Sequence, residues 1–420
     1  MNKRRFITLT LLFVFAIPWN STTTQAQVCV PLAKTTVVPC ASGVNIDFTE
    51  PRPGELELLR AAGFRWVRMD FKWDVTEIER GKYDFGPYER LMSSLDSVGV
   101  KALFILDYGN PLYDDGAPPR STETRQAFTN WALAAAKKFR GRGIIWELYN
   151  EPNHDLFWPP RPDADEYATL ALMVGKAFSD ELPNEILIGP AVSEIDLGFL
   201  ESCFKRGTLK YWPAVSVHPY KREGPESVAS DYAGVRRLIE KYAPIEKRQM
   251  PIISSEWGYS TAWPGISDSR QSELLIRTWL TNLAYGVRLS IWYDWRDDGM
   301  DRQEAEHNFG AVSQNFRLKP AYVAARTFNE FFAGHSFERR MKLLDERDYL
   351  FAFRKGSELR WAAWTTNETH AALIKLDPGS YERVDHLGNN LGKIEIGSPG
   401  ISLPLASAPI FLRKQTFVKN

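Results

Sequence analysis

The sequence predicts an α/β protein: a (β/α)8 TIM barrel followed by a small C-terminal antiparallel β-sandwich. Eight short apolar runs alternate with helical patterns over roughly 290 residues, the size and rhythm of such a barrel. From about Phe337 the runs become short and are separated by turn residues, which is typical of a small sandwich. A doubly wound open sheet is the alternative, but no glycine-rich phosphate loop follows the first run.

The first 26 residues have the pattern of an export signal. Lys3, Arg4 and Arg5 precede a mostly apolar stretch, and residues 24–26 form a small-residue cleavage pattern. The stretch is shorter than the ~20 residues of a spanning helix. We therefore expect a signal peptide at 1–26, the barrel at 27–336 and the sandwich at 337–420. The mature protein is expected to be secreted or periplasmic, with no membrane insertion after cleavage.

The barrel strands are predicted from β-branched and aromatic residues in short apolar runs. The eight runs are Val44–Phe48, Trp66–Asp70, Val100–Asp107, Ile144–Glu151, Ile186–Val192, Val215–Tyr220, Ile252–Glu256 and Val287–Trp295. Between them, apolar residues at helical spacing predict helices. These are Glu55–Ala62, Tyr88–Ser97, a helix containing Phe128 to Phe139, Tyr167–Phe178, Ala233–Tyr242, Gln271–Ala284 and Ala321–Phe332.

The charge balance argues against a nucleic-acid partner. The chain has 52 basic and 52 acidic side chains, and removal of the leader leaves 49 basic ones. Binding to nucleic acid depends on clustered positive charge, which a slightly acidic mature chain does not favour. Fourteen Trp and sixteen Tyr residues are many for this length. Such side chains stack on the apolar faces of sugar rings, so the composition fits a carbohydrate partner.

Three cysteines and six histidines bear on disulfides and metals. Cys29 and Cys40 bracket a short segment and are expected to pair in an oxidising compartment, while Cys203 stays free. Unpaired thiols remain the alternative. The histidines are scattered and lack the close spacing of a zinc-ligand pair. We expect neither a metal nor an organic cofactor.

Two glutamates at strand ends are the strongest functional signal. Glu151 follows the fourth strand within Asn150-Glu151-Pro152-Asn153, and Glu256 ends the seventh strand. A retaining glycoside hydrolase needs such a pair, one to protonate the leaving oxygen and one to attack the anomeric carbon. Glu147 is a competing choice for the acid, but we expect it to be a buried partner of Arg68 or of another inner polar group.

Other strand ends carry polar or aromatic groups that suit a sugar site. Because the C-terminal ends of barrel strands meet at the active face, these side chains are expected to converge. Arg68 would hold Glu256 ionised, Tyr220 would donate a hydrogen bond to it, and Trp295 would form the floor of the sugar site. Each alone is more often a packing residue. The full set of candidate substrate-binding residues is Asn150, Arg68, Asp70, His218, Tyr220, Trp295 and Trp257.

This ordered set resembles the clan A glycoside hydrolases. The segments Trp66–Asp70 and Tyr149–Asn153, with the trailing sandwich, look most like family 39, which includes β-xylosidases, α-L-iduronidases and bacterial endoglycosidases. Family 5 cellulase-like enzymes share most of these residues. The resemblance implies that Glu151 is the acid/base, that Glu256 is the nucleophile, and that Asn150 hydrogen-bonds the sugar 2-hydroxyl.

The mechanism implied is double displacement with retention. The negative charge of Glu256 disfavours ionisation of Glu151, so Glu151 is expected to start protonated. The alternative from another class is a sugar-binding barrel without catalysis, which predicts loss of one carboxylate, whereas this chain retains both. We expect a monomer acting on an oligo- or polysaccharide.

The substrate mode is predicted from aromatic residues near the strand ends. A row of platforms suits several sugar subsites in a groove, whereas an exo-acting pocket needs only one or two. We therefore expect endo action on a neutral β-linked polysaccharide, with an exo-acting β-glycosidase, xylosidase-like, as the alternative. The expected platforms are Trp73, Trp158, Trp257, Trp263 and Trp295.

Overall fold

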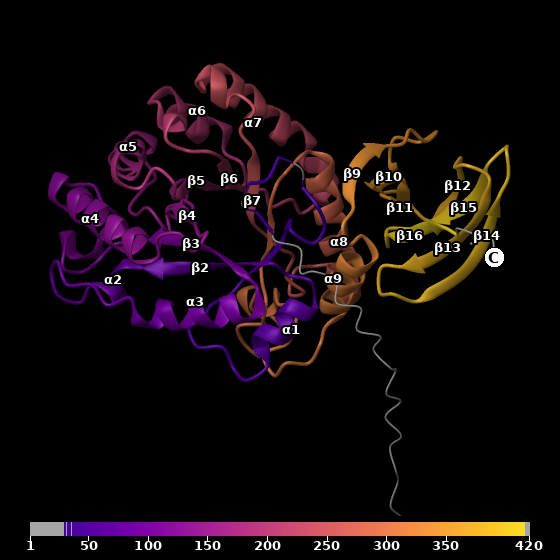
Figure 1. Cartoon of the computed structure of the whole chain (residues 1–420), viewed down its shortest axis with the longest axis horizontal. Helices are drawn as coiled ribbons and strands as arrows, with labels where there is room; N and C mark the ends of the chain where they lie inside the picture. Colours follow the sequence, from indigo (N-terminus) through magenta and orange to yellow (C-terminus); the bar gives the residue numbers. More distant parts are fainter. Residues whose placement is uncertain (1–28, 31, 35, 416–420) are drawn as a thin grey trace, which may run out of the picture.

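The computed structural model describes residues 29–30, 32–34 and 36–415, and it shows a barrel joined to a smaller β-domain (Figure 1). Eight parallel strands close in sequence order, which confirms the predicted fold class. The first strand begins earlier than expected, at Ser42 in place of Val44. The strands are β1 Ser42–Asn45, β2 Trp66–Lys72, β3 Lys101–Asp107, β4 Ile145–Leu148, β5 Ile186–Ser193, β6 Val215–His218, β7 Ile252–Trp257 and β8 Ser290–Trp292.

The helices surround the barrel and bury their apolar faces against it. The longer ones begin at side-chain caps: Ser121 accepts from the Thr124 amide at 3.1 Å at the start of α4. Leu197–Lys205, α6, is a helix that the sequence analysis did not predict. The others are α1 Glu55–Ala61, α2 Trp73–Thr76, α3 Gly86–Val98, α4 Thr122–Lys138, α5 Ala164–Glu181, α7 Ala229–Tyr242, α8 Asp268–Ala284 and α9 Pro320–Phe331.

Alternation along each strand divides the apolar residues into an outer and an inner cluster. On β2, Trp66 packs inside the barrel while Val67 packs outward against the helices. On β3, Leu103 and Ile105 point inward. Arg68 continues the inward row of β2 and Asp107 that of β3, so both face the barrel axis near the C-terminal ends of their strands.

An irregularity in β7 directs Glu256 inward. Simple alternation along the strand would put Ser254 and Glu256 on the same face. In the structure Ile253 belongs to the inner cluster, so Ser254 faces outward, and the pairing of β7 with β8 shifts between Ser254 and Trp257. Such a bulge adds one residue and reverses the alternation. Glu256 therefore reaches the barrel interior by a route that the sequence pattern did not show.

The C-terminal domain packs on the barrel through aromatic side chains. Phe332, just after α9, lies 4.5 Å from Phe353 and 5.1 Å from Phe411 between ring centroids. The indole of Trp364 also donates to Glu226 of the barrel at 2.7 Å. A six-stranded sheet ordered β14-β13-β16-β11-β10-β9 faces a two-stranded sheet β12-β15. Their bounds are β9 Ser336–Arg340, β10 Asp348–Lys355, β11 Glu358–Thr365, β12 His370–Ile374, β13 Gly379–Asp385, β14 Asn390–Ile396, β15 Ile401–Leu405 and β16 Ile410–Lys414.

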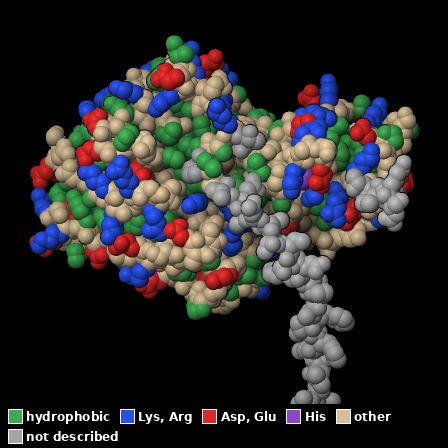
Figure 2. Space-filling model, viewed as in Figure 1, with side chains coloured by type: hydrophobic (Ala, Val, Ile, Leu, Met, Phe, Trp, Pro, Cys, Tyr) green, Lys and Arg blue, Asp and Glu red, His purple; other side chains and the backbone are tan. Residues whose placement is uncertain are grey.

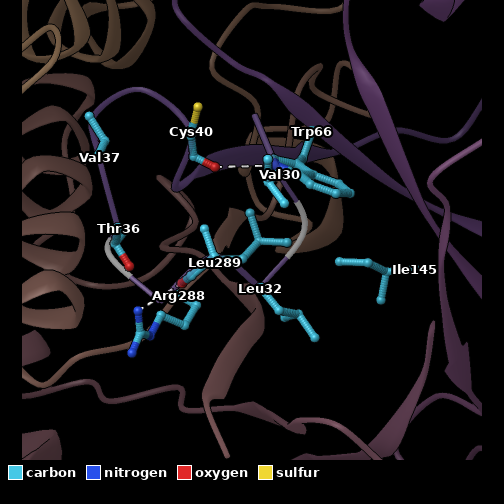
Figure 3. A pocket seen from close by; sticks show the side chains of 10 residues that line it. Val30, Leu32, Thr36, Val37, Cys40, Trp66, Ile145, Arg288 and Leu289 are labelled. Carbon is cyan, nitrogen blue, oxygen red and sulfur yellow. Dashed lines mark hydrogen bonds between the residues drawn. The ribbon is translucent and has the colours of Figure 1, made fainter. Parts of the chain in front are cut away.

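The segment before β1 covers the N-terminal end of the barrel (Figure 3). A disulfide joins Cys29 to Cys40, which confirms the expected pairing, and Cys203 is a buried free thiol. Trp66 donates its indole N–H to the Cys40 carbonyl at 3.2 Å, and Arg288 donates to the Ala33 carbonyl at 2.7 Å. A small cavity of about 110 Å³ remains between this segment and the strand starts.

The proposed signal peptide, 1–26, lies outside the described residues. Among the helices that the structure describes, none combines the length and apolar character needed to cross a membrane. On the face shown in Figure 2, basic and acidic side chains are interspersed over both the barrel and the β-domain.

Candidate active site

Arg68 lies at the centre of a charged network inside the C-terminal end of the barrel. Its side chain is 1% exposed, and its Nε donates to Glu147 at 2.8 Å. The expectation that Glu147 is a buried partner of Arg68 is thereby confirmed. The remaining four N–H groups point to the C-terminal ends of β1, β4, β6 and β7, so all five donors of the guanidinium are used. They contact Asn45 at 3.4 Å, Glu256 at 2.7 Å, Asn150 at 2.8 Å and His218 at 3.2 Å.

Two donors hold the carboxylate of Glu256. Arg68 Nη1 donates to Oε2 at 2.7 Å, and the Tyr220 hydroxyl donates to Oε1 at 2.8 Å. Hydrogen bonds to both oxygens, one from a fixed cation, stabilise the charged form. Burial and the Glu256 charge raise the pKa of Tyr220 well above its ordinary value, so the phenol stays protonated and remains a donor.

Glu151 lies opposite, hydrogen-bonded to His218. Arg68 can only donate, so its bond to His218 leaves Nδ1 as the ring nitrogen whose N–H donates to Glu151 Oε1, at 2.8 Å. Burial raises the pKa of Glu151, but hydrogen bonds from His218 and Ser193 outweigh burial and leave that pKa below its ordinary value. This direction is opposite to the expectation that Glu151 starts protonated, which considered repulsion by Glu256 and not the hydrogen bond from His218.

The backbone after β4 is bent to present Asn150 and Glu151. Tyr149 and Glu151 have φ of 68° and 43°, a left-handed conformation that is costly for residues with a side chain and is often found at functional sites. Asn153 fixes the turn, because its side chain accepts from the Ser193 amide at 2.8 Å and donates to the Ser193 carbonyl at 3.0 Å. Asn150 accepts from Arg68, which leaves its amide N–H groups available to a ligand.

Glu151, His218 and Glu256 approach closely enough to raise the question of a metal. One side-chain atom from each lies within 4.8 Å of the others. These atoms already have protein donors, however: Arg68 and Tyr220 bind Glu256, and His218 donates to Glu151. The positive charge that a cation would supply comes from a guanidinium 2.7 Å from Glu256. The set fits a hydrogen-bonded carboxylate pair better than a metal centre.

The network opens into a cavity of about 1120 Å³ at the C-terminal ends of the strands. Asp70, Arg68, Asn150 and Tyr220 line it with both glutamates, whereas the buried His218 is not among its lining residues and lies behind Glu151. Acidic side chains outnumber Lys and Arg side chains in its lining. The acidic ones are Asp47, Asp70, Glu151, Glu194, Glu223, Glu256 and Glu306, and the Lys and Arg residues are Arg68, Lys72, Lys221 and Arg222.

Two expected substrate-binding residues do not reach this cavity. Trp295 is 1% exposed, and its indole N–H donates to buried Glu55 at 2.9 Å. Trp257 is also 1% exposed and packs beside Tyr259. Both predictions are wrong, because an aromatic residue at a strand end can face the helices as well as the barrel axis. Of the five expected tryptophan platforms, Trp73 and Trp158 are likewise buried, and only Trp263 lines the cavity.

Several lining residues were missed by the sequence analysis. Tyr293 follows the inward-facing Ile291 by two positions, so strand alternation could have indicated it. Its hydroxyl donates to Glu306 at 3.1 Å. Tyr108 stacks on Phe157 at 5.6 Å between ring centroids and forms an aromatic wall on the Glu151 side. Phe157 lies in a loop, which has no periodic pattern of apolar residues.

Comparisons with known proteins support the fold. The chain resembles a family 39 glycoside hydrolase from Bacteroides cellulosilyticus WH2, with a TM-score of 0.79 and 24% identity over 90% of this chain and 81% of that one. It also resembles a monomeric β-xylosidase from Caulobacter crescentus CB15 (TM-score 0.66, 17% identity, 90% and 96% covered). A third similar structure is a GH30 endoxylanase from Clostridium papyrosolvens C71 (TM-score 0.64, 10% identity, 92% and 98% covered).

No protein-family model and no curated protein sequence matches the chain. At identities below 25% the similarity to solved structures establishes a shared architecture. The chain therefore shares the fold of these solved glycoside hydrolase structures, and in this chain that fold is a TIM barrel with an appended β-domain.

Proposed function

We propose that this protein is a retaining glycoside hydrolase in which Glu256 is the nucleophile and Glu151 is the acid/base. One observation carries the proposal: oxygens of the two carboxylates lie within 4.8 Å of each other across an open cavity. Retaining enzymes place their carboxyl groups ~5–5.5 Å apart, whereas inverting enzymes need ~6.5–9.5 Å to admit a water. The close pair suits direct attack on a sugar held between them.

The first step is attack by Glu256 on the anomeric carbon. Arg68 and Tyr220 each donate to one oxygen of the attacking carboxylate and so fix its orientation. The glycosidic bond breaks as Glu151 gives its proton to the leaving oxygen. In the second step the Glu151 carboxylate takes a proton from water, the resulting hydroxide attacks the anomeric carbon, and Glu256 is released. Two inversions restore the original configuration.

Glu151 must be protonated for the first step, although His218 favours its charged form in the free enzyme. A bound sugar would cover Glu151 and remove solvent, which adds to the upward effect of burial on its pKa. His218 in turn stabilises the carboxylate that forms once the proton has been transferred. This arrangement favours an enzyme that works best on the acidic side of neutrality.

The substrate class follows from the cavity. Its volume of about 1120 Å³ exceeds the ~300–1,000 Å³ typical of pockets for small ligands, so several sugar units fit. The acidic excess of its lining disfavours uronic acids. Aromatic walls lie on two sides, Tyr108 with Phe157 on one and Trp263 with Phe309 on the other. These aromatic walls favour endo action on a neutral β-linked polysaccharide.

Exo action is the second candidate. It is favoured by the resemblance to the monomeric β-xylosidase from Caulobacter crescentus. A monomer exported through the signal at 1–26, acting in the periplasm or outside the cell, fits either mode. The disulfide between Cys29 and Cys40 is consistent with such an oxidising location.

The test is a screen of the mature protein against β-linked polysaccharides, with product sizes measured by mass spectrometry and polymer viscosity followed over time. Endo action predicts a rapid fall in viscosity with oligosaccharide products. Release of monosaccharide alone at nearly constant viscosity would establish exo action. Glu256→Ala should be inactive on any glycan that is cleaved, and Glu240→Ala, an exposed glutamate on α7, should match the wild type. Equal activity of both variants would refute the proposed function.

A further inference from the structure

A second carboxyl pair, Asp70 and Asp107, lies near Arg68 at the C-terminal ends of β2 and β3. Asp70 follows Arg68 by two residues on β2 and lines the cavity. Asp107 ends the neighbouring strand β3, where it is paired in register with Lys72. Both aspartates continue inward-facing rows, those of Trp66 and Ile105. The two side chains therefore meet at the base of the cavity wall.

Asp107 has an unusual environment for a carboxyl group. It is 0% exposed, and neither of its oxygens has a donor among the described residues. A buried carboxylate that accepts no hydrogen bond is strongly destabilising, so burial favours the neutral form of the group. Burial and the charge of Asp70 raise the pKa of Asp107 well above its ordinary value, while Arg68 opposes this.

A protonated Asp107 could fix the orientation of the Asp70 carboxylate. Its O–H can donate to one oxygen of Asp70, a charge-assisted bond between the two carboxyl groups. The side chain of Asp70 is one-third exposed, which leaves its other oxygen facing the cavity as an acceptor. Lys72 Nζ lies 3.8 Å from Asp70 and is about half exposed, so a donor stands beside this acceptor.

We propose that Asp70, held by a protonated Asp107 and flanked by Lys72, selects the sugar bound at the catalytic glutamates by reading its ring hydroxyls. An anionic acceptor beside a cationic donor matches two adjacent hydroxyls, one donating and one accepting. The same acceptor repels a sugar carboxylate, which agrees with a neutral substrate. The substrate role rests on the proposed glycosidase function, whereas the shared proton does not.

The first experiment compares variants on the glycan that the polysaccharide screen identifies as the best substrate. Asp107→Asn keeps a donor to Asp70, because the amide N–H replaces the acid O–H, so kcat/KM should stay within about threefold. Asp107→Leu removes that donor and should lower kcat/KM roughly 10- to 100-fold. Asp74→Asn makes the same substitution at an exposed carboxylate on α2 outside the cavity lining and should leave kcat/KM unchanged. Equal effects of Asp107→Asn and Asp107→Leu would overturn the donor role.

The second experiment avoids the buried position, where a substitution can impair folding. Asp70→Ala alters a partly exposed side chain, and its kcat/KM is measured on the substrate and on analogues lacking one ring hydroxyl at a time. If Asp70 reads a hydroxyl, removing that hydroxyl costs the wild type roughly 10-fold or more but costs Asp70→Ala little. Additive losses at every hydroxyl would overturn the proposal.

The third readout needs no substrate. In protein labelled with ¹³C at aspartate carboxyl groups, NMR should show one carboxyl that is still protonated at neutral pH and that disappears in Asp107→Asn. Absence of such a signal would overturn the shared proton even in an active enzyme. Its presence in a protein without glycosidase activity would refute the proposed function but leave the pair intact.

Discussion

The two ends of the barrel are built from the same strands but have opposite character. At the C-terminal ends, a cavity of about 1120 Å³ exposes ionisable groups around a buried guanidinium. At the N-terminal ends, a disulfide-bonded segment covers an apolar interior and leaves only about 110 Å³ (Figure 3). The orientation of the charged groups at the C-terminal end should determine activity. The burial of apolar contacts at the N-terminal end should determine stability. Substitutions at the two ends should therefore separate activity from stability.

The largest effect is expected at the catalytic end, from Glu256→Ala. Loss of the nucleophile should lower kcat on the order of 10⁴-fold or more, with little loss of stability. Azide or formate should restore part of the activity, because a small anion can take the place of the carboxylate. Glu151→Ala should lose roughly 10²–10⁴-fold on ordinary glycans but should spare substrates whose leaving group needs no proton. Near-native activity of both variants on an unactivated glycan would refute the assignment.

Arg68→Met should damage activity and stability together, because Arg68 is both buried and part of the site. Its loss leaves Glu147 and Glu256 without their counter-ion, which should cost about 3–5 kcal/mol in the free energy of unfolding, measured with urea. The matched control is Arg288→Met at the N-terminal end, which removes one hydrogen bond to Ala33. The control should lose about 1–3 kcal/mol of stability and keep its kcat. A reversed pattern would contradict the division between the two ends.

Removing the disulfide should affect stability alone. Cys29→Ser with Cys40→Ser opens a loop of 11 residues in sequence separation, worth about 3 kcal/mol in the chain-entropy model. The double variant should unfold at lower denaturant concentration, while kcat and KM stay unchanged below the transition. A fall in kcat of the folded double variant would mean that the segment before β1 affects the catalytic cavity at the other end of the barrel.

The smallest effect is a displacement of the pH profile by His218→Phe. The acid must be protonated, so kcat/KM falls as the pH rises through the pKa of Glu151 in the free enzyme. The variant lacks the hydrogen bond from His218 that lowers the pKa of Glu151. The basic limb of kcat/KM should therefore move to higher pH, with a lower maximum. An unchanged basic limb, or one at lower pH, would contradict the role given to His218.

The fold could be predicted because each strand satisfies a local rule. A short apolar run that is buried on both faces is typical of a strand in a parallel sheet. Eight such runs with helices between them predict a closed (β/α)8 barrel. The polar ends of those strands then had to converge, which is why Arg68, Asn150, Tyr220 and the two glutamates meet.

The features of the site that the sequence did not predict depend on long-range partners, which set the direction or the protonation of a side chain. Trp295 lies three residues after β8 ends, and its direction follows from the buried acceptor on Glu55, 240 residues away in sequence. The inward turn of Glu256 depends on the β7 bulge, which is a property of pairing with β8. The protonation of Glu151 depends on a histidine from another strand. None of these long-range partners leaves a pattern in the local sequence.

The most direct test of the central claim is the stereochemistry of the first product. A proton-NMR time course of hydrolysis of a β-linked oligosaccharide distinguishes the two anomers before mutarotation mixes them. Double displacement through Glu256 predicts that the β anomer appears first and that the α anomer grows in later. Initial appearance of the α anomer would contradict the retaining mechanism, even if substitution of either glutamate abolished activity.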